Sequence, residues 1–280
     1  MKRVYYLCLS AILLAACTNE NENVFNGLPA EDETEVTLTF SPYDVTPMTR
    51  TATSIATYCT HLDVWLVEGD NTTAVHQTSS DAGFGSLSVT LNKTKTYTIY
   101  AVAHKCTSDA TLADVVITFP DNKVTHSMFY TTTFTPSETT DLSCLMQRIV
   151  SQFSFSTTDQ VPANVVKMTL TVNDVFDRWN VSTGGTHSLD RVSTFQNFST
   201  HDDGTVTFNI FSIVTDAQTT HDITVTAYDA QDNIVQTRTF ADVPLRNGYK
   251  TSYRGVYFTD TPTAAIFTVN DWNEYDEVSF

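Results

Sequence analysis

Leu87-Ser88-Val89-Thr90-Leu91 alternates apolar and polar side chains, and this alternation decides the fold class. Successive side chains of a β-strand point to opposite faces of a sheet, so the pattern puts three apolar side chains on one face and two hydroxyls on the other. The 49 threonines among the 280 residues favour the same structure, because β-branched Thr suits a half-exposed strand better than a helix. The sequence therefore predicts an all-β protein.

The same period-2 alternation recurs from Thr34 onward, in short runs separated by Asp, Asn, Ser and Thr turns. The apolar faces of such runs include Val36, Leu38 and Phe40; Leu62, Val64 and Leu66; Tyr97, Ile99, Ala101 and Ala103; Leu142, Cys144 and Met146; Val166, Met168, Leu170 and Val172; Val206, Phe208 and Ile210. Residues 108–114 form the one short helix candidate. This pattern is typical of a sandwich of antiparallel strands.

The apolar positions change from even to odd numbers near Gln147 and Arg148, where Ile149 and Phe153 continue the pattern. A slip of one residue moves every side chain to the other face, so we expect a bulge or a passage between two cores at this point. The sequence thus predicts two antiparallel β-sandwich domains, residues 34–147 and 148–280, each close to the usual size of ~100–150 residues.

The N-terminus has the features of an export signal. Two basic residues precede an apolar run over residues 4–16, which is shorter than the ~20 residues that a membrane-spanning helix needs. The run ends in Leu14-Ala15-Ala16-Cys17, which resembles the bacterial lipobox and implies a diacylglycerol on Cys17 after cleavage before it. The alternative is an ordinary cleavage site at which Cys17 is incidental. We expect a lipoprotein signal peptide over residues 1–16 and a lipidated Cys17 with a flexible polar spacer over residues 17–33.

The charge of the chain excludes some partners. With 15 Lys and Arg against 32 Asp and Glu, the formal net charge is −17, so a nucleic-acid partner is not expected. Loss of Lys2 and Arg3 with the leader leaves 13 basic against 32 acidic residues, a net charge of −19. An anionic membrane face should repel such a protein, so we expect outer-membrane lipid to hold it only through acyl chains on Cys17.

No segment predicts catalysis or a cofactor. Gly83-Phe84-Gly85 is not followed by a helix pattern, so it predicts a turn and not a phosphate-binding loop. No Ser lies between glycines as in the hydrolase elbow. Carboxylate pairs such as Asp202-Asp203 lie in turn-like polar stretches, where solvated charge is the ordinary outcome. We therefore expect neither an enzyme nor a bound metal.

Two short motifs combine cysteine with histidine. Cys59 and His61 lie two residues apart, as do His104 and Cys106, so neighbouring strands could offer a zinc site of four ligands. Exported proteins more often oxidise such cysteines, which makes a disulfide between Cys59 and Cys106 the second interpretation. Buried free thiols, Cys144 included, are the third. The sequence leaves these three alternatives open.

Three tryptophans are candidates for contact with a glycan. Trp65 alternates with Val64 and Leu66, which places it on the second face of a strand. Trp179 and Trp272 lie in polar stretches and are more readily exposed. Packing in a core or between domains is the competing interpretation for each of them.

Several segments together resemble the fimbrial anchor and fimbrillin lipoproteins of Bacteroidetes type V pili, closest to the FimB-like minor-fimbrium anchor family. These are the lipobox at Cys17, Pro47-Met48-Thr49-Arg50, Leu62-Asp63-Val64-Trp65-Leu66, Tyr97-Thr98-Ile99-Tyr100-Ala101-Val102-Ala103, Arg148-Ile149-Val150, Arg246-Asn247-Gly248-Tyr249, Gly255-Val256-Tyr257-Phe258 and Val269-Asn270-Asp271-Trp272-Asn273. The resemblance covers nearly the whole mature chain. It implies two tandem transthyretin-like sandwiches and assembly by strand exchange without catalysis.

The resemblance also implies roles for particular residues. Stalk subunits of the family are opened by a protease that cuts after an arginine, here Arg50. An anchor keeps its first strand and its lipid, and it donates its C-terminal strand to a fimbrial shaft subunit. In this chain Ala265, Phe267 and Val269 alternate as an inserted strand requires. We therefore expect a surface-exposed anchor at the fimbrium base, the alternatives being a stalk or tip fimbrillin processed after Arg50 and a stand-alone glycan-binding lipoprotein that uses Trp179 or Trp272.

Overall fold

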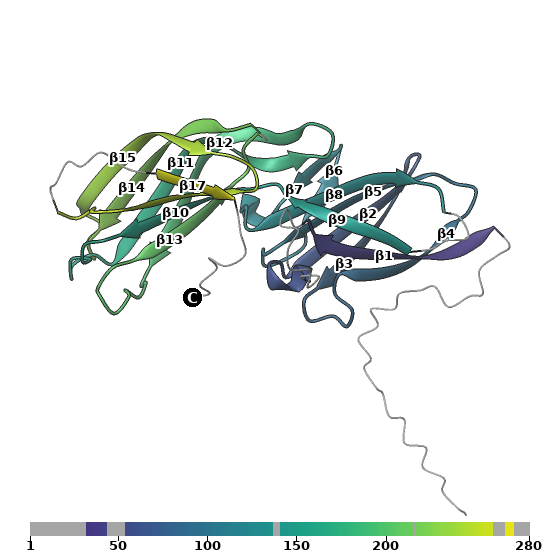
Figure 1. Ribbon diagram of the computed structural model, residues 1–280, viewed down its shortest axis with the longest axis horizontal. Helices are drawn as coiled ribbons and strands as arrows, with labels where there is room; N and C mark the ends of the chain where they lie inside the picture. The colour runs from purple at the N-terminus through teal and green to yellow at the C-terminus, as the bar shows by residue number, and fades with distance from the viewer. Residues whose placement is uncertain (1–31, 44–53, 137–140, 216, 260–266, 272–280) are drawn as a thin grey trace, which may run out of the picture.

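The computed structural model describes residues 32–43, 54–136, 141–215, 217–259 and 267–271. Within these ranges the chain folds almost entirely into β-strands, and its helical segments are two 3-10 turns, η1 (Ile55–Thr57) and η2 (Pro120–Asn122). The predicted all-β fold class is confirmed. Figure 1 shows two β-rich halves that lie side by side along the long axis. The described part of the chain has no helix long and apolar enough to cross a membrane.

The N-terminal half is a seven-stranded sheet with the strand order β3-β2-β5-β8-β9-β1-β4. Its strands are β1 (Glu33–Pro42), β2 (His61–Glu68), β3 (Asn71–Thr78), β4 (Ser86–Asn92), β5 (Tyr97–His104), β8 (Ser127–Phe134) and β9 (Asp141–Arg148). β1 runs antiparallel to β4 and parallel to β9, so the first strand lies between them. Leu38, Leu62 and Ile99 are fully buried, and the sheet encloses them as the N-terminal core.

The C-terminal half places two sheets around a second core. Its strands are β10 (Ser151–Thr157), β11 (Lys167–Asn180), β12 (Gly184–Gln196), β13 (Thr207–Ser212), β14 (Thr219–Tyr228), β15 (Ile234–Leu245), β16 (Tyr249–Gly255) and β17 (Phe267–Asp271). One sheet has the order β13-β10-β16-β17, and in the other β11 lies between β14 and β12. Phe153, Leu170 and Val225 are buried between them. β10 lies between antiparallel β13 and parallel β16, so it repeats the arrangement of β1 between β4 and β9.

A hairpin from the N-terminal half crosses to the C-terminal half. β6 (Thr111–Ala113) and β7 (Val116–Thr118) pair with each other, and β7 continues the sheet of β11 by pairing Ile117 with Trp179. The short helix candidate over residues 108–114 is therefore wrong, because residues 111–113 form strand β6. A short polar segment has weak local preferences, and here the pairing with β11 decides its conformation. The sheet β15-β14-β11-β7-β6 thus contains strands from both sides of residue 147.

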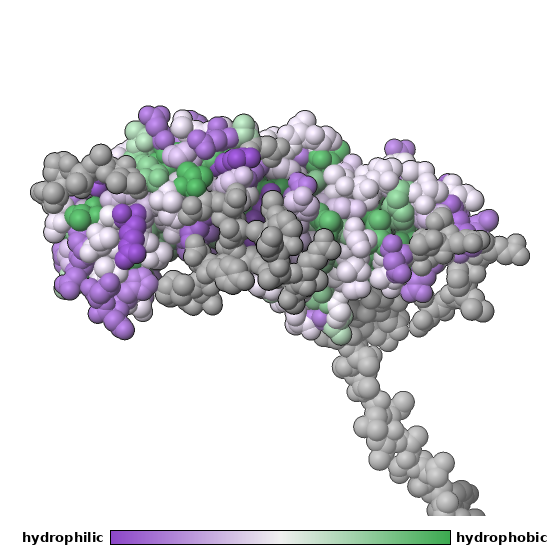
Figure 2. All heavy atoms as spheres, in the orientation of Figure 1, coloured by the Kyte–Doolittle hydropathy of each residue, from purple (hydrophilic) through white to green (hydrophobic). Residues whose placement is uncertain are grey.

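A third group of buried side chains, the central cluster, fills the space between the halves. It contains Trp65, Val102, Cys106, Ala110, Ile117, Phe119, Val124, Phe129, Ile149, Val150, Val181 and Ile213. The chain passes between the halves from the end of β9 at Arg148 to the start of β10 at Ser151. Strands β2 and β5 are therefore covered on both faces, by the N-terminal core and by the central cluster. On the face that Figure 2 shows, the described apolar side chains form separate small patches among polar ones.

Candidate functional site

The C-terminal strand lies at the edge of its own sheet. β17 pairs along one side with β16, in a register that joins Tyr253 to Phe267. Phe267 and Val269 are half-buried, and Thr268 between them is exposed. The ring centroid of Phe267 lies 5.9 Å from that of Phe240 and 6.0 Å from that of Tyr253. In this structure the segment expected to be donated completes the C-terminal sheet of its own chain.

The first strand is held far more firmly. β1 pairs with β4 on one side and with β9 on the other, whereas among the described residues β17 has a partner on one side only. Val36, Leu38 and Phe40 on its inner face are all buried in the N-terminal core. Removal of β1 would take three buried side chains out of the N-terminal core, whereas removal of β17 would take away two half-buried side chains and uncover the rings of Phe240 and Tyr253.

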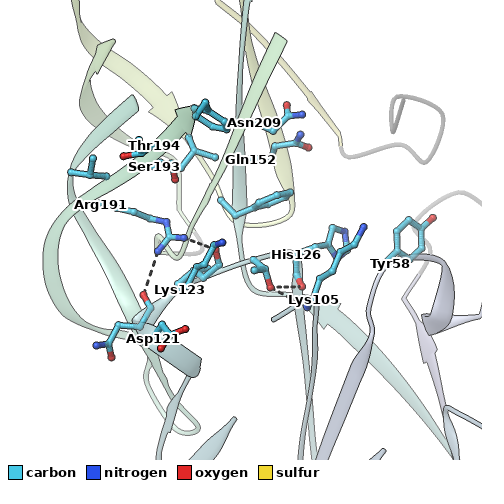
Figure 3. Close-up of a pocket in the computed structure, with 17 residues that line it drawn as sticks. Tyr58, Lys105, Asp121, Lys123, His126, Gln152, Arg191, Ser193, Thr194 and Asn209 are labelled. Atoms are coloured by element: carbon cyan, nitrogen blue, oxygen red, sulfur yellow. Dashed lines mark hydrogen bonds between the residues drawn. The ribbon is translucent and has the colours of Figure 1, made fainter. Parts of the chain in front are cut away.

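A pocket of about 710 Å³ lies between the two halves. Residues 191–195 of β12, 209–211 of β13 and Gln152 of β10 form one side of it, and residues 121–126 with Tyr58 and Lys105 form the other. Figure 3 shows these side chains facing one another from strands of the C-terminal half and loops of the N-terminal half. We call it the interdomain pocket.

Arg191 is the most buried cation of the interdomain pocket, with 7% of its surface exposed. Its Nη2 donates to the carbonyl of Val124 at 2.5 Å and its Nη1 to the carbonyl of Asn122 at 3.5 Å, as the dashed lines in Figure 3 mark. Asp121 and Asn122 have the positive φ angles of 54° and 51° that Asp and Asn tolerate, and this turn presents the two carbonyls. Burial lowers the pKa of Arg191, but a guanidinium remains charged.

Two amide side chains line the same pocket without using their hydrogen-bonding groups. Gln152 is 5% exposed, and its side chain has no hydrogen bond to any described residue. Asn209 lies beside it in Figure 3, is exposed, and likewise has no side-chain hydrogen bond within the described ranges. The amide atoms of Gln152 are not fully enclosed by protein, so they face the open space of the pocket, where a ligand can reach them.

An aromatic stack closes one end of the pocket. The rings of Tyr58 and His126 stack with centroids 5.1 Å apart and an interplanar angle of 11°. Arg148 lies over the Tyr58 ring, with its Cζ atom 5.0 Å from the centroid. Burial, together with the positive charges of Arg148 and Lys105, lowers the pKa of His126 to about 3, so this ring is neutral.

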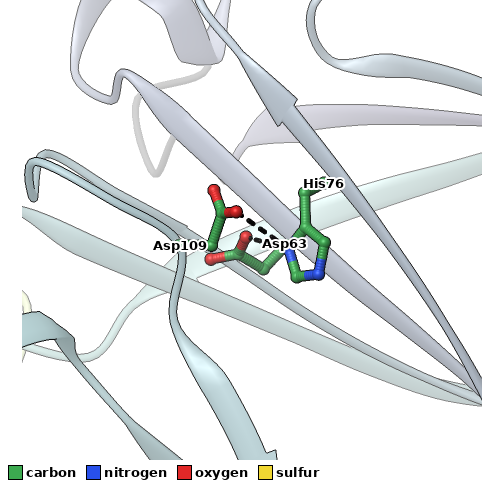
Figure 4. A group of neighbouring side chains, drawn as sticks. All are labelled: Asp63, His76 and Asp109. Carbon is green, nitrogen blue, oxygen red and sulfur yellow. Dashed lines mark hydrogen bonds and ion pairs between the residues drawn. The ribbon is translucent and has the colours of Figure 1, made fainter. Parts of the chain in front are cut away.

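Asp63 is the centre of a buried hydrogen-bond network in the N-terminal half. Its carboxylate accepts from His76 Nδ1 at 2.6 Å, from His104 Nε2 at 2.7 Å and from the backbone N–H of Ala110 at 2.9 Å. The carboxylate of Asp109 lies 3.9 Å from His76 Nδ1, and Figure 4 shows the three side chains converging. Because both oxygens of Asp63 already have protein partners, we assign the network a structural role: it ties β2 to β3, β5 and the segment before β6.

The positions of Cys59 and Cys106 do not agree with the zinc and disulfide alternatives. Cys59 precedes β2 and lies in the N-terminal core, whereas Cys106 follows β5 and lies in the central cluster on the other face of the sheet. His61 stacks on His104, with the ring centroids 5.3 Å apart. Cys59, Cys106 and Cys144 are free, buried thiols in this structure, which agrees with the third of the three alternatives. Burial raises the pKa of Cys144 to about 12, which makes its thiol unreactive.

Trp179 is half-buried and packs between the halves, while its expected contact with a glycan stays a prediction. Its ring packs against Phe129, with the centroids 5.6 Å apart, at the edge of the central cluster. Cys17, Arg50, Ala265 and Trp272 lie outside the described residues. Their expected roles stay predictions.

The residues of the interdomain pocket were missed at the sequence level. Gln152 and Arg191 are single polar residues in strands, and Lys123 belongs to a polar loop. The one available signal was Lys105, which lies between His104 and Cys106 in a motif considered for metal binding. No local pattern brings these segments together, because strand order and packing between the halves do so.

Comparison with known proteins gives the fold but no family. No protein-family model matches the sequence, and no curated protein matches it. A candidate adhesin from Bacteroides thetaiotaomicron matches with a TM-score of 0.53, at 10% identity over 88% of this chain and 98% of its own. The chain shares its fold with that adhesin. At such identity the likeness establishes the architecture and no more.

Two further structures also match. A candidate polysaccharide-binding protein from Bacteroides thetaiotaomicron has a TM-score of 0.51, at 10% identity over 85% of this chain and 96% of its own. The fimbrial anchor protein Mfa2 from Porphyromonas gingivalis is a weaker match, with a TM-score of 0.46 at 11% identity over 85% and 97% of the two chains.

Proposed function

We propose that this chain is a non-catalytic subunit of an adhesive surface fimbrium, held at the outer membrane by acyl chains on Cys17, and that it serves as the anchor at the fimbrium base. The leader and lipobox support export and lipidation. The fold shared with candidate adhesins supports a surface role. The resemblance of the sequence to anchor lipoproteins supports the position at the base.

The difference between the two terminal strands carries the proposal. β1 is paired on both sides and buried, as in a subunit that keeps its first strand and accepts none from a neighbour. β17 is a five-residue edge strand with one partner and half-buried side chains. The chain is therefore better suited to give a strand than to receive one.

Strand donation has a simple physical basis. Release of β17 exposes the backbone edge of β16, and insertion of β17 into a neighbouring subunit replaces the lost ladder hydrogen bonds with equivalent ones. Phe267 and Val269, two residues apart, would enter the neighbour's core from one face of the strand. Such a donor joins the shaft, and polymerisation stops at the subunit that accepts no strand.

Crosslinking on intact cells tests this proposal. A thiol crosslinker applied to the Thr268→Cys variant should join the exposed middle of β17 to a shaft subunit of the fimbrium. Thr72→Cys on β3 is the matched control, because this position is also exposed but lies in the N-terminal half. Equal crosslinking at both positions, or crosslinking only within the same chain, would contradict donation of β17.

Deletion and sequencing separate the alternatives. Deletion of residues 267–280 should leave a folded, lipidated protein at the cell surface that no longer retains fimbriae. Unchanged retention would favour a stand-alone lipoprotein. Sequencing of the mature surface form should show a blocked, acylated start at Cys17, whereas a start at Thr51 would identify a processed stalk or tip subunit.

A further inference from the structure

The interdomain pocket concentrates positive charge in an acidic molecule. The whole chain has 15 basic and 32 acidic residues, yet Lys105, Lys123 and Arg191 line this pocket with Asp121 as its one carboxylate. Within the described ranges, none of the three cations has a carboxylate at ion-pair distance. A cleft lined by one sign of charge raises the local concentration of ions of the opposite sign.

Arg191 has the features of an anion-binding group. A guanidinium that is 7% exposed would ordinarily be paired, since burial of an isolated charge is costly. Two backbone carbonyls accept from its terminal nitrogens, but its Nε is buried and has no hydrogen-bond partner. The buried carboxylate of Asp177 acts on Arg191 electrostatically, but its direct ion pairs are with Arg178 and His187. Within the described ranges the guanidinium therefore has no carboxylate in direct contact.

Gln152 indicates that the ligand is more than an inorganic ion. The residue is 5% exposed, lines the pocket, and its side chain has no hydrogen bond to a described residue. Asn209 and Ser193 line the same side, also without side-chain hydrogen bonds. An amide or hydroxyl can both donate and accept, which suits the hydroxyls of a sugar. An acidic peptide would instead require a row of backbone partners.

We propose that the interdomain pocket binds a carboxylate-bearing sugar unit of an acidic glycan. Arg191, Lys105 and Lys123 hold the carboxylate, and the amides of Gln152 and Asn209 hold ring hydroxyls. The half-buried Phe211 side chain provides an apolar surface on which a sugar ring can lie. The volume of about 710 Å³ falls within the ~300–1,000 Å³ of small-ligand sites. This binding is separate from subunit assembly, since the pocket contains no residue of β17.

Calorimetric titration of the purified lipidated protein tests the proposal. The probes are short oligosaccharides of galacturonate, glucuronate and N-acetylneuraminate, with neutral galactose oligosaccharides of the same length, inorganic sulfate and a tetraglutamate peptide as comparisons. At least one acidic oligosaccharide should bind at least tenfold more tightly than its neutral counterpart, and than sulfate. Affinity should fall as salt concentration rises.

Variants assign the binding to this pocket. Lys123→Ala and Gln152→Leu should each weaken binding of the acidic oligosaccharide at least fivefold, because one loses charge and the other loses the buried amide. Lys95→Ala is the matched control: this exposed lysine is remote from the pocket and should leave affinity unchanged. Thermal unfolding confirms that each variant is folded, and neither test variant removes the buried guanidinium.

Three outcomes overturn the proposal. The first is the absence of binding by all three acidic oligosaccharides at 10 mM, which is roughly ten times a weak dissociation constant of 1 mM. The second is equal affinity for acidic and neutral sugars, or a loss of affinity in Lys95→Ala as large as that in Lys123→Ala and Gln152→Leu. The third is tighter binding of the tetraglutamate peptide with the same sensitivity to Lys123→Ala, which would identify an acidic-peptide site.

Discussion

His126 lines the interdomain pocket, and its pKa is strongly lowered by its surroundings. It is 2% exposed, and Arg148 Nε donates to its Nε2 at 3.4 Å, so Nδ1 carries the ring proton and faces the Cys59 sulfur at 3.9 Å. Burial and the nearby charges of Arg148 and Lys105 lower its pKa to about 3. The surrounding protein thus favours the neutral ring.

Acidification should therefore destabilise the protein through His126. An unfolded histidine has a pKa of ~6.5, so between pH ~6.5 and ~3 the unfolded chain binds one proton that the folded chain does not. The stabilising contribution is complete above pH ~6.5 and falls as the pH decreases. From pH 7 to pH 5 the wild type should lose about 2 kcal/mol more unfolding free energy than His126→Gln.

Urea denaturation at the two pH values measures this difference. His126→Gln is a suitable reference because its amide can keep hydrogen bonds to Arg148 and has no titrating group. Identical losses in the two proteins would show that His126 does not titrate across this range.

The turn of the β6–β7 hairpin contains two residues with unfavourable backbone conformations. Asp114 and Val115 connect the strands with φ angles of 45° and 64°, the positive values of a type I′ turn. Asp tolerates this region, but the β-branched side chain of Val115 does not, and half of that side chain is exposed. The strain persists because Val115 O accepts from the N–H of Val181 and β7 pairs with β11.

Val115→Gly should increase stability. Glycine adopts the positive φ without the clash of Cβ, which costs ~1–2 kcal/mol, while its extra freedom in the unfolded chain costs ~0.5–1 kcal/mol. We expect a net gain of about 0.5–1 kcal/mol in unfolding free energy. Val115→Ala keeps Cβ and is the control, so an equal gain in both variants would mean that backbone strain is not the cause.

One strand is shared between the two halves, so we expect the whole molecule to unfold as one unit. The first part of β11 pairs with β14 inside the C-terminal half, and its last residues, Arg178 to Asn180, pair with β7 from the N-terminal half. A bulge between Val172 and Val175 separates the two parts. Ile117 is fully buried in the central cluster at this junction. The halves are therefore joined by a continuous sheet as well as by the chain.

Ile117→Ala should uncouple the two halves. Truncation of a fully buried Ile costs ~2–5 kcal/mol, and here the loss falls on contacts between the halves. Calorimetry of the wild type should show one unfolding transition, and the variant should show two. Thr111→Ala, an exposed change in the same hairpin, should keep the single transition. A single transition in both variants at the same midpoint would contradict the coupling.

Local sequence predicts the strands and their faces, because the alternation of side chains along a strand is a local property. It put Leu66 and Trp65 on opposite faces of β2, and the structure has Leu66 in the N-terminal core and Trp65 in the central cluster. It erred at residues 108–114, where a short segment takes its conformation from β11. Cleavage and acylation at Cys17 are predictions of the sequence alone.

Which segments meet depends on the three-dimensional packing of the chain. Arg191 from β12, Gln152 from β10 and Lys123 from a loop of the other half form one pocket because the strand order and the cross-half hairpin bring them together. Likewise, β1 and β17 both show alternation in sequence, but β1 is an inner strand and β17 an edge strand. Strand neighbours are set by long-range burial and hydrogen bonding, which no local pattern of residues encodes.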